Sequence, residues 1–286
     1  MALTINTNLG SLIVQKNLTD ATNALNRSIE RMTTGYKINS AGDDAAGYAV
    51  ATKMETQLGS ISVAQDNVAM GSSMLSTMES NYDLISTHLQ RIRDLTEEAA
   101  NGTYGQDSID AIKAEVDARW AEIDRIAASA EFNGIKLLDG TKSTAGITLQ
   151  IGIGTVAAND QLTLAGATYF AKADAKTLTG VEKATFTGYF TVGGTNYNTA
   201  LGAIDTALGK VTTLQTQIGA MQNRLDSAAD ALDVQYSNVT SSLSTVKDAD
   251  VAAESSEYIK AQILQQASAS LLSTANQTPS IALNLI

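Results

Sequence analysis

Apolar residues recur along most of the chain at alternating steps of three and four, which places them in one line on an α-helix, here called a seam. From residue 61 the seam is continuous and predicts a long helix that ends near 101–102, because Asn and Gly tolerate the left-handed backbone that stops a helix. A second helix is predicted over 109–126. Its seam is interrupted by Arg119, and it stops before the turn-like 132–134. The first seam consists of Ile61, Ala64, Val68, Gly71, Leu75, Met78, Tyr82, Ile85, Leu89 and Ile92.

The longest seam runs from Leu201 to Val246 and predicts a helix longer than any compact globule needs. Gln215 and Gln222 lie on this seam, where amide side chains can fix the register between helices. Between the helical stretches, residues 134–209 are rich in glycine and contain short alternating runs at 147–153 and 161–164. These runs predict strands and hairpins. The predicted fold is mostly α, an elongated bundle of long coiled-coil helices with a small β-hairpin region in the middle of the chain.

Both ends of the chain carry a narrower version of the same pattern. Few apolar side chains lie on each stripe, and their burial gains less free energy than ordering some twenty backbone residues costs. Each terminal helix therefore needs a partner, which is the other terminus, a second subunit, or both. The stripes are Val14, Leu18, Leu25, Ile29 and Met32 at one end, and Ile263, Leu264, Ala267, Leu271 and Leu272 at the other.

Composition narrows the function classes. The formal net charge is −11, which argues against binding to nucleic acid or to anionic membranes, because both rely on Lys and Arg contacts with phosphates. No apolar run approaches ~18 residues, so membrane insertion is not expected. The chain lacks cysteine, which excludes disulfides and thiolate sites. Its first residues do not have the pattern of a Sec-type signal peptide, so any export is expected to use no cleaved leader.

Few residues suggest site chemistry. Asp43 and Asp44 are adjacent carboxylates, but a metal or acid–base site needs further ligands and a cleft, so a solvated or subunit-contacting turn is the simpler interpretation. The single histidine, His88, is expected on a helix surface. Met70, Met74 and Met78 are expected to pack rather than to bind a cofactor. We predict no cofactor, no metal site and no enzymatic activity.

Segments at both ends of the chain resemble the bacterial flagellins. Near the N-terminus these are RMTTG at 31–35 and INSAGDDAAG at 38–47. Near the C-terminus, IGAMQNRL at 218–225, KAQILQQA at 260–267 and ANQTP at 275–279 are also similar. The resemblance covers about 1–140 and 200–286, and Leu149 to Leu164 is similar to the hairpin beside the long flagellin helices. Where the family often carries arginines, this chain has Leu243 and Thr245.

The resemblance implies a near-minimal flagellin without large outer domains. Residues 1–42 and 250–286 would form an inner terminal coiled-coil domain, and 43–249 a helical core domain with a glycine-rich hairpin insert at about 134–200. The implied function is a structural subunit that self-assembles into the extracellular flagellar filament, used for motility and exported unfolded through the flagellar type III route. The alternative within the family is a hook–filament junction protein, and a catalytic site in the glycine-rich middle is a third hypothesis without a supporting motif.

The resemblance also implies partners. These are other copies of the chain, an export chaperone at the C-terminus, and the cap and junction proteins of the filament. The segment 89–95 resembles the patch that vertebrate Toll-like receptor 5 recognises, and by that resemblance Arg91, Leu95 and Glu115 contact the receptor. Arg91 and Leu95 are four residues apart and are expected on one helix face beside the seam. The simpler interpretation is an ordinary solvated flank.

Overall fold

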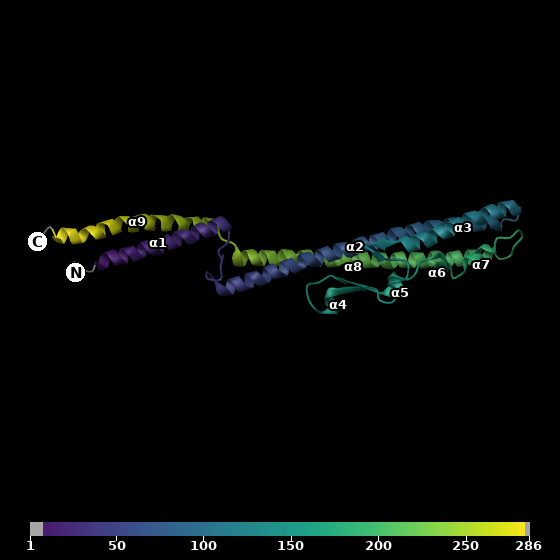
Figure 1. Cartoon of the computed structure of the whole chain (residues 1–286), viewed down its shortest axis with the longest axis horizontal. Coiled ribbons are helices and arrows are strands. Elements are labelled where there is room, and N and C mark those ends of the chain that lie inside the picture. The colour runs from purple at the N-terminus through teal and green to yellow at the C-terminus, as the bar shows by residue number, and fades with distance from the viewer. Residues whose placement is uncertain (1–7, 284–286) are drawn as a thin grey trace. The chain divides into compact units, whose positions relative to one another are not determined.

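The computed structural model describes residues 8–283, with side chains described through residue 277. Long helices dominate it (Figure 1), which confirms the predicted mostly helical fold with a small hairpin region. The helices are α1 (Leu9–Thr34), α2 (Ala45–Ala100), α3 (Gln106–Ser129), α4 (Ala157–Asp160), α5 (Gly166–Tyr169), α6 (Ala175–Thr179), α7 (Lys183–Thr187), α8 (Tyr197–Lys247) and α9 (Val251–Leu283). The strands are β1 (Glu131–Phe132), β2 (Ile135–Lys136), β3 (Ile147–Gln150) and β4 (Gln161–Leu164).

The chain divides into two compact units. One, the terminal unit, contains residues 1–58 and 237–286, and the other, the central unit, contains residues 59–236. The terminal unit therefore includes the start of α2 and the end of α8 as well as α1 and α9. The predicted inner domain of 1–42 and 250–286 refers to the assembled state and stays a prediction.

The central unit is built on the predicted seams. Every seam position of α2 from Ile61 to Ile92 is buried. In α3 the buried positions include Ile109, Val116 and Ile123, and Trp120 is buried directly after the interrupting Arg119. The two seam glutamines of α8 join this helix to α2, since Gln215 Nε2 donates to Asp83 Oδ1 at 2.6 Å and Gln222 Nε2 to Glu79 Oε2 at 3.0 Å. Their predicted role in register is consistent with these bonds.

The middle of the chain contains two antiparallel hairpins. The first, β1–β2, turns at Asn133 and Gly134, both with positive φ, as a tight two-residue hairpin requires. In the second, β3–β4, Leu149 is opposite Leu162, which confirms the predicted hairpin. It packs on α2, where a Cβ at Gly71 would lie 2.6 Å from Leu149 Cδ1, so glycine makes this close approach possible.

The strands and hairpins predicted between residues 134 and 209 occur in the first half of this region, and the second half differs. Among the described residues, 166–187 form the short helices α5, α6 and α7 instead. Asp174 caps α6 by accepting from Thr177 N at 2.9 Å, and Gly180 ends it with φ 74°. Behind these turns lies an aromatic cluster in which Trp120 and Phe186 have ring centroids 4.9 Å apart. Tertiary packing therefore outweighs the weak local pattern.

The expectation that all three methionines pack is wrong for Met70. Met74 and Met78 pack in the core, but Met70 is 58% exposed because it lies between the seam positions Val68 and Gly71. None of the described helices combines the length and the apolar character that a membrane crossing requires.

Candidate assembly surface

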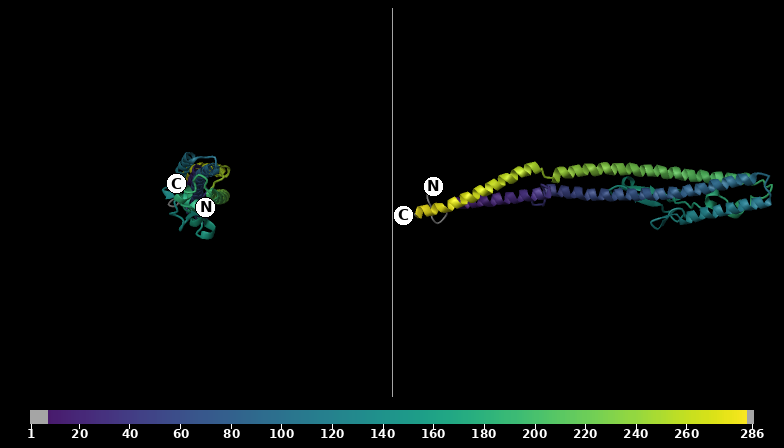
Figure 2. Two further views of the ribbon diagram at one scale, coloured as in Figure 1. Left: turned by 90° about the vertical axis from the view of Figure 1, so that its right-hand side faces the viewer. Right: turned by 90° about the horizontal axis from the view of Figure 1, so that it is seen from above.

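The terminal helices α1 and α9 lie side by side and antiparallel (Figures 1 and 2). Contacts at three levels show the direction. Asn8 Nδ2 donates to the Ala275 carbonyl at 2.7 Å, Gln265 Nε2 donates to Thr22 Oγ1 at 3.2 Å, and Arg31 pairs with Glu254 at 3.7 Å. The beginning of α1 thus contacts the end of α9, as expected if each terminus is the other's partner.

The interior of this helix pair is formed by small side chains. On α1 the buried residues are Ala21 and Ser28. On the part of α9 whose side chains are described, through residue 277, they are Ala261 and Ser268, so the spacing is seven on each helix. Such a heptad spacing is that of a coiled-coil seam. Alanine and serine allow close approach of the backbones, but they bury little apolar surface. The pair therefore gains less hydrophobic stabilisation than a seam of fully buried leucines would give, since Val14, Leu18 and Leu25 on the same seam are only half-buried.

Larger apolar side chains of the two helices remain exposed, and we call them the exposed apolar set. Their exposed fractions range from 37% to 67%. Fully burying a side chain of this size contributes about 1.5–3 kcal/mol, so a partner that covers the set gains much more than the intramolecular seam does. The set is Leu9, Leu12, Ile13, Ile29, Met32, Val251, Ile259, Ile263, Leu264 and Leu271.

Some residues of the predicted stripes lie partly buried in the α1–α9 pair, and the others are exposed. Val14, Leu18 and Leu25 of α1 and Leu272 of α9 are half-buried. Ile29 and Met32 on α1 are exposed, and so are Ile263, Leu264, Ala267 and Leu271 on α9. The predicted C-terminal stripe is therefore left largely uncovered within one chain.

Sequence reasoning missed the small and polar residues that join the pair. Besides Ala21, Ser28, Ala261 and Ser268, these include Ser11, whose Oγ donates to Asn276 Oδ1 at 2.7 Å. The missed signal was present in the spacing. Counting small and polar residues as seam positions gives steps of three and four through Ser11, Val14, Leu18, Ala21, Leu25 and Ser28.

A junction connects the terminal helices to α2 and α8 within the terminal unit. Gly35 ends α1 with φ 76°, and its carbonyl accepts from Ala249 N at 2.8 Å. Lys37 N donates to the Lys247 carbonyl at 2.8 Å, so Tyr36 and Asp248 form an isolated antiparallel bridge. The ammonium of Lys247 lies 4.4 Å from the Tyr36 ring centroid and pairs with Glu55 at 2.5 Å. These bonds fix where the chain leaves one helix and enters the next.

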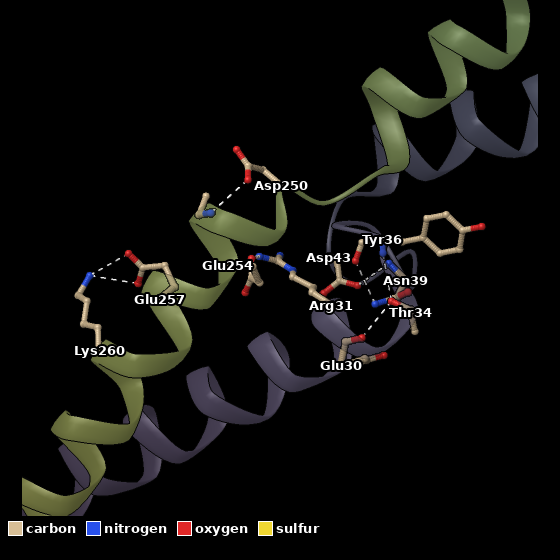
Figure 3. Close-up of polar contacts among 11 residues, drawn as sticks. Glu30, Arg31, Thr34, Tyr36, Asn39, Asp43, Asp250, Glu254, Glu257 and Lys260 are labelled. Carbon is tan, nitrogen blue, oxygen red and sulfur yellow. Dashed lines mark hydrogen bonds and ion pairs between the residues drawn. The ribbon is translucent and has the colours of Figure 1, made fainter.

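The acidic residues of the junction accept backbone hydrogen bonds, as Figure 3 shows for Asp43 and Asp250. Asp43 accepts from Ser40 N at 3.0 Å, and the hydrogen bonds of Ser40 hold the pKa of this exposed carboxyl below its usual value. Asp44 accepts from Ala46 N and Gly47 N at the start of α2, and Asp250 accepts from Ala252 N at the start of α9. The residues described contain no group of three His, Asp or Glu placed to hold a metal ion. Asp43 and Asp44 lie in an exposed turn between α1 and α2, and a contact of this turn with a second subunit stays a prediction.

The proposed receptor residues lie in the central unit. Arg91 on α2 forms a two-pronged contact with Glu115 on α3, with Nε–Oε1 at 3.0 Å and Nη2–Oε2 at 3.3 Å. The hydrogen bond from Arg91 is the main reason that the pKa of Glu115 is lowered. Arg91 is exposed and Glu115 half-buried, whereas Leu95 is 1% exposed and belongs to the core. The expectation that Leu95 lies with Arg91 beside the seam is therefore wrong, because Leu95 continues the buried line three residues after Ile92.

The histidine His88 is near the same patch. It is half-buried, and its Nδ1 lies 3.4 Å from Arg119 Nη1. Burial and the neighbouring guanidinium lower its pKa, so the neutral ring is favoured. It is a helix-flank residue in contact with its neighbour.

The terminal pair and the central helices match known family models. The model for the bacterial flagellin N-terminal helical region matches residues 5–143, and the model for the C-terminal helical region matches residues 201–286. Among curated relatives, the flagellin of Xenorhabdus nematophila is 35% identical over an alignment of 319 residues that covers all of both chains. The polar flagellin F of Vibrio parahaemolyticus is 30% identical, also over the full length of both.

Other relatives are longer or less similar. The chain is 44% identical to the B-type flagellin of Pseudomonas aeruginosa over 144 residues, which is 50% of this chain and 30% of that protein. Among solved structures, a putative flagellar hook-associated protein from Vibrio parahaemolyticus superposes with a TM-score of 0.60 at 19% identity, covering 72% of this chain and all of that one, which shows a common fold. The two family models and the two full-length relatives show that the chain belongs to the bacterial flagellin family.

Proposed function

We propose that this chain is a structural subunit that polymerises with copies of itself into the extracellular flagellar filament used for motility, without catalytic activity. The observation that carries the proposal is the exposed apolar set of α1 and α9. A large number of exposed apolar side chains on two adjacent helices is typical of a protein–protein contact. Membership of the flagellin family supports a contact between copies of the same chain.

The experiment tests whether this surface drives assembly. A triple variant, Ile263→Ser, Leu264→Ser and Leu271→Ser, removes apolar surface from α9 without touching the buried Ala261 and Ser268. Since each side chain contributes on the order of 1.5 kcal/mol or more when buried, growth on filament seeds is expected to fall at least about tenfold. Electron microscopy and light scattering measure it.

A matched control changes exposed polar positions of the same helix. Gln266→Ala, Ser270→Ala and Ser273→Ala also replace three exposed residues of α9, but these lie outside the exposed apolar set. This variant is expected to elongate seeds at close to the rate of the intact chain. Equal growth of both variants would contradict the role of the exposed apolar set.

A hook–filament junction protein is the second candidate function. It would use the same paired termini, and the likeness to the hook-associated protein concerns the fold alone. Seeded growth of the intact chain separates the two. A filament subunit elongates a seed continuously, whereas a junction protein adds a limited number of copies and stops.

We also propose an export route and further partners. A chain whose terminal helices gain less from their own seam than a seam of buried leucines would give is suited to passage in an unfolded form through the flagellar type III route. An export chaperone that covers Ile263, Leu264 and Leu271 before assembly would shield the apolar residues of α9, and the cap and junction proteins would meet the same ends in the filament. Recognition by vertebrate Toll-like receptor 5 is proposed through Arg91 and Glu115, which present a charged pair on the central unit.

A further inference from the structure

The chain contains two Asn–Gly steps, at 101–102 and at 133–134. Asparagine followed by glycine is prone to spontaneous deamidation, in which the backbone nitrogen of the glycine attacks Cγ of the asparagine. Glycine favours this attack because it has no side chain to obstruct its nitrogen and its backbone rotates freely. Both asparagines are exposed, so water reaches each of them. Exposure therefore does not separate the two steps, and the local backbone does.

The step at 101–102 lies in the link between α2 and α3, outside both helices. Asn101 Oδ1 accepts from Thr103 N at 3.4 Å, which folds the asparagine side chain over the Gly102 peptide. The same N–H points at the oxygen on which negative charge develops when Cγ is attacked. Among the hydrogen bonds of the described residues, none uses Gly102 N as a donor. A Cβ placed on Gly102 would meet no atom within 4 Å, so the surrounding space is open.

The step at 133–134 is held by the β1–β2 hairpin. Asn133 and Gly134 have φ 48° and 77°, the two left-handed conformations of a two-residue turn. Antiparallel pairing of Phe132 with Ile135 closes the turn directly beside them. Bringing Gly134 N onto the side chain of Asn133 requires rotation about the backbone bonds of Asn133, and that rotation would break the pairing. The hairpin therefore protects Asn133 although its side chain is exposed.

We propose that Asn101 is a site of spontaneous deamidation in the folded chain and that Asn133 is not. Gly102 N bonds to Asn101 Cγ, the Cγ–Nδ2 bond breaks, and the proton of Gly102 N passes through solvent to the departing nitrogen, which leaves as ammonia. Water then opens the resulting succinimide at either carbonyl, which gives aspartate or isoaspartate. Either product adds a negative charge beside Glu97 and Glu98 at the C-terminal end of α2, where the helix dipole disfavours it. This site is independent of the proposed polymerisation.

The competing interpretation gives Asn101 and Gly102 only the role of ending α2, for which both residue types are suited. The fold then has no influence on the chemistry, and the two Asn–Gly steps deamidate at similar rates in the folded chain. The two accounts differ in the ratio of the two rates. They also differ in whether unfolding changes that ratio.

The test incubates the full-length chain in mildly alkaline buffer, with and without urea, and follows both asparagines by peptide mapping and mass spectrometry. In the folded chain, Asn101 is expected to convert at least about tenfold faster than Asn133, because conversion of Asn133 has to wait for the hairpin to open. In urea the hairpin is absent, and the two rates are expected to agree within about threefold. Anion exchange separates the converted chains by their added charge.

Gly102→Ala adds a methyl group in open space, so it is expected to fold normally and to slow conversion of Asn101 at least about fivefold. Gly202→Ala, which also adds a methyl group in open space, on α8, is the control and is expected to leave that rate unchanged. Equal rates at Asn101 and Asn133 in the folded chain, or a faster rate at Asn133, would overturn the proposal. So would a rate ratio that persists in urea, because the flanking sequence and not the hairpin would then set it.

Discussion

The terminal helices and the central helices follow the same period but bury different residues. In the central unit, α2 buries Leu75, Met78, Ile85 and Leu89 at 0–1% exposure. In the terminal unit, the fully buried side chains described on α1 and α9 are alanine and serine, and the leucines and isoleucines are half-buried or exposed. A helical repeat of apolar residues therefore does not show whether the apolar face of a helix is buried within its own chain. The size of the residues on the buried seam shows it.

The largest effect is expected from deleting the terminal helices α1 and α9. A chain without residues 1–40 and 250–286 loses α1 and α9 but keeps the seams of α2, α3 and α8. It is expected to remain helical and monomeric, because those seams bury one another. Seeded growth is expected to disappear. Circular dichroism and seeding measure the two properties, and growth at the rate of the intact chain would show that the terminal helices are not the assembly elements.

A second prediction compares one leucine in the central unit with one leucine in the terminal unit. Leu89→Ala removes a buried side chain from the central unit and is expected to destabilise the monomer by about 2–5 kcal/mol. Leu271→Ala removes an exposed side chain from α9, so the expected change in the monomer is within about 0.5 kcal/mol. Denaturant unfolding measures both.

In seeded growth we expect Leu271→Ala, not Leu89→Ala, to have the larger effect. Leu271→Ala is expected to slow elongation, and Leu89→Ala to elongate normally at temperatures where it stays folded. If Leu271→Ala destabilised the free monomer as much as Leu89→Ala, the exposed position would already be covered within one chain.

The smallest effect on stability is expected at the receptor patch. Arg91→Ala or Glu115→Ala removes a surface ion pair, and such pairs contribute little to folding. We expect only a small decrease in melting temperature at neutral pH and reduced signalling through Toll-like receptor 5 in reporter cells. Lys113→Ala, on the same α3, is the control. Unchanged signalling by the double variant Arg91→Ala, Glu115→Ala would remove these residues from the receptor site.

The same pair has a defined pH dependence. The pKa of Glu115 is lowered in the folded chain, mainly by the hydrogen bond from Arg91. Its contribution is therefore present above the unfolded-state pKa and is lost as the pH falls through the folded-state pKa. Melting curves of the intact chain and of Glu115→Gln should converge in acid. A difference that grew on acidification would contradict this assignment.

The sequence was most informative where large apolar residues repeat. The α2 seam, the α3 seam and the β3–β4 hairpin could be predicted because each depends on a local period or alternation. Leu95 could also have been placed in the core, since it extends the seam by three residues. The short helices α5, α6 and α7 could not be predicted, because four or five residues contain too little periodicity and their position depends on packing with α3 and α8.

The candidate assembly surface was only partly predictable. Hydrophobic patterning identified Ile263, Leu264 and Leu271, but it did not separate the side of α9 that meets α1 from the side that stays exposed. That separation depends on Ala261 and Ser268, which a search for large apolar residues passes over. The junction bonds between 35–37 and 247–249 join residues far apart in sequence and have no local signal.

Hydrogen exchange of the free monomer and of the filament tests the central claim most directly. A seam of alanine and serine is expected to hold α1 and α9 together only weakly in one chain, and burial of the exposed apolar set in the filament is expected to stabilise both helices. Amides in residues 10–35 and 255–275 should then exchange within seconds in the dilute monomer and become protected in the filament, while α2 and α8 are protected in both. Strong protection of α1 and α9 in the dilute monomer would show that the pair is stable by itself, and the coupling of terminal folding to polymerisation would be wrong.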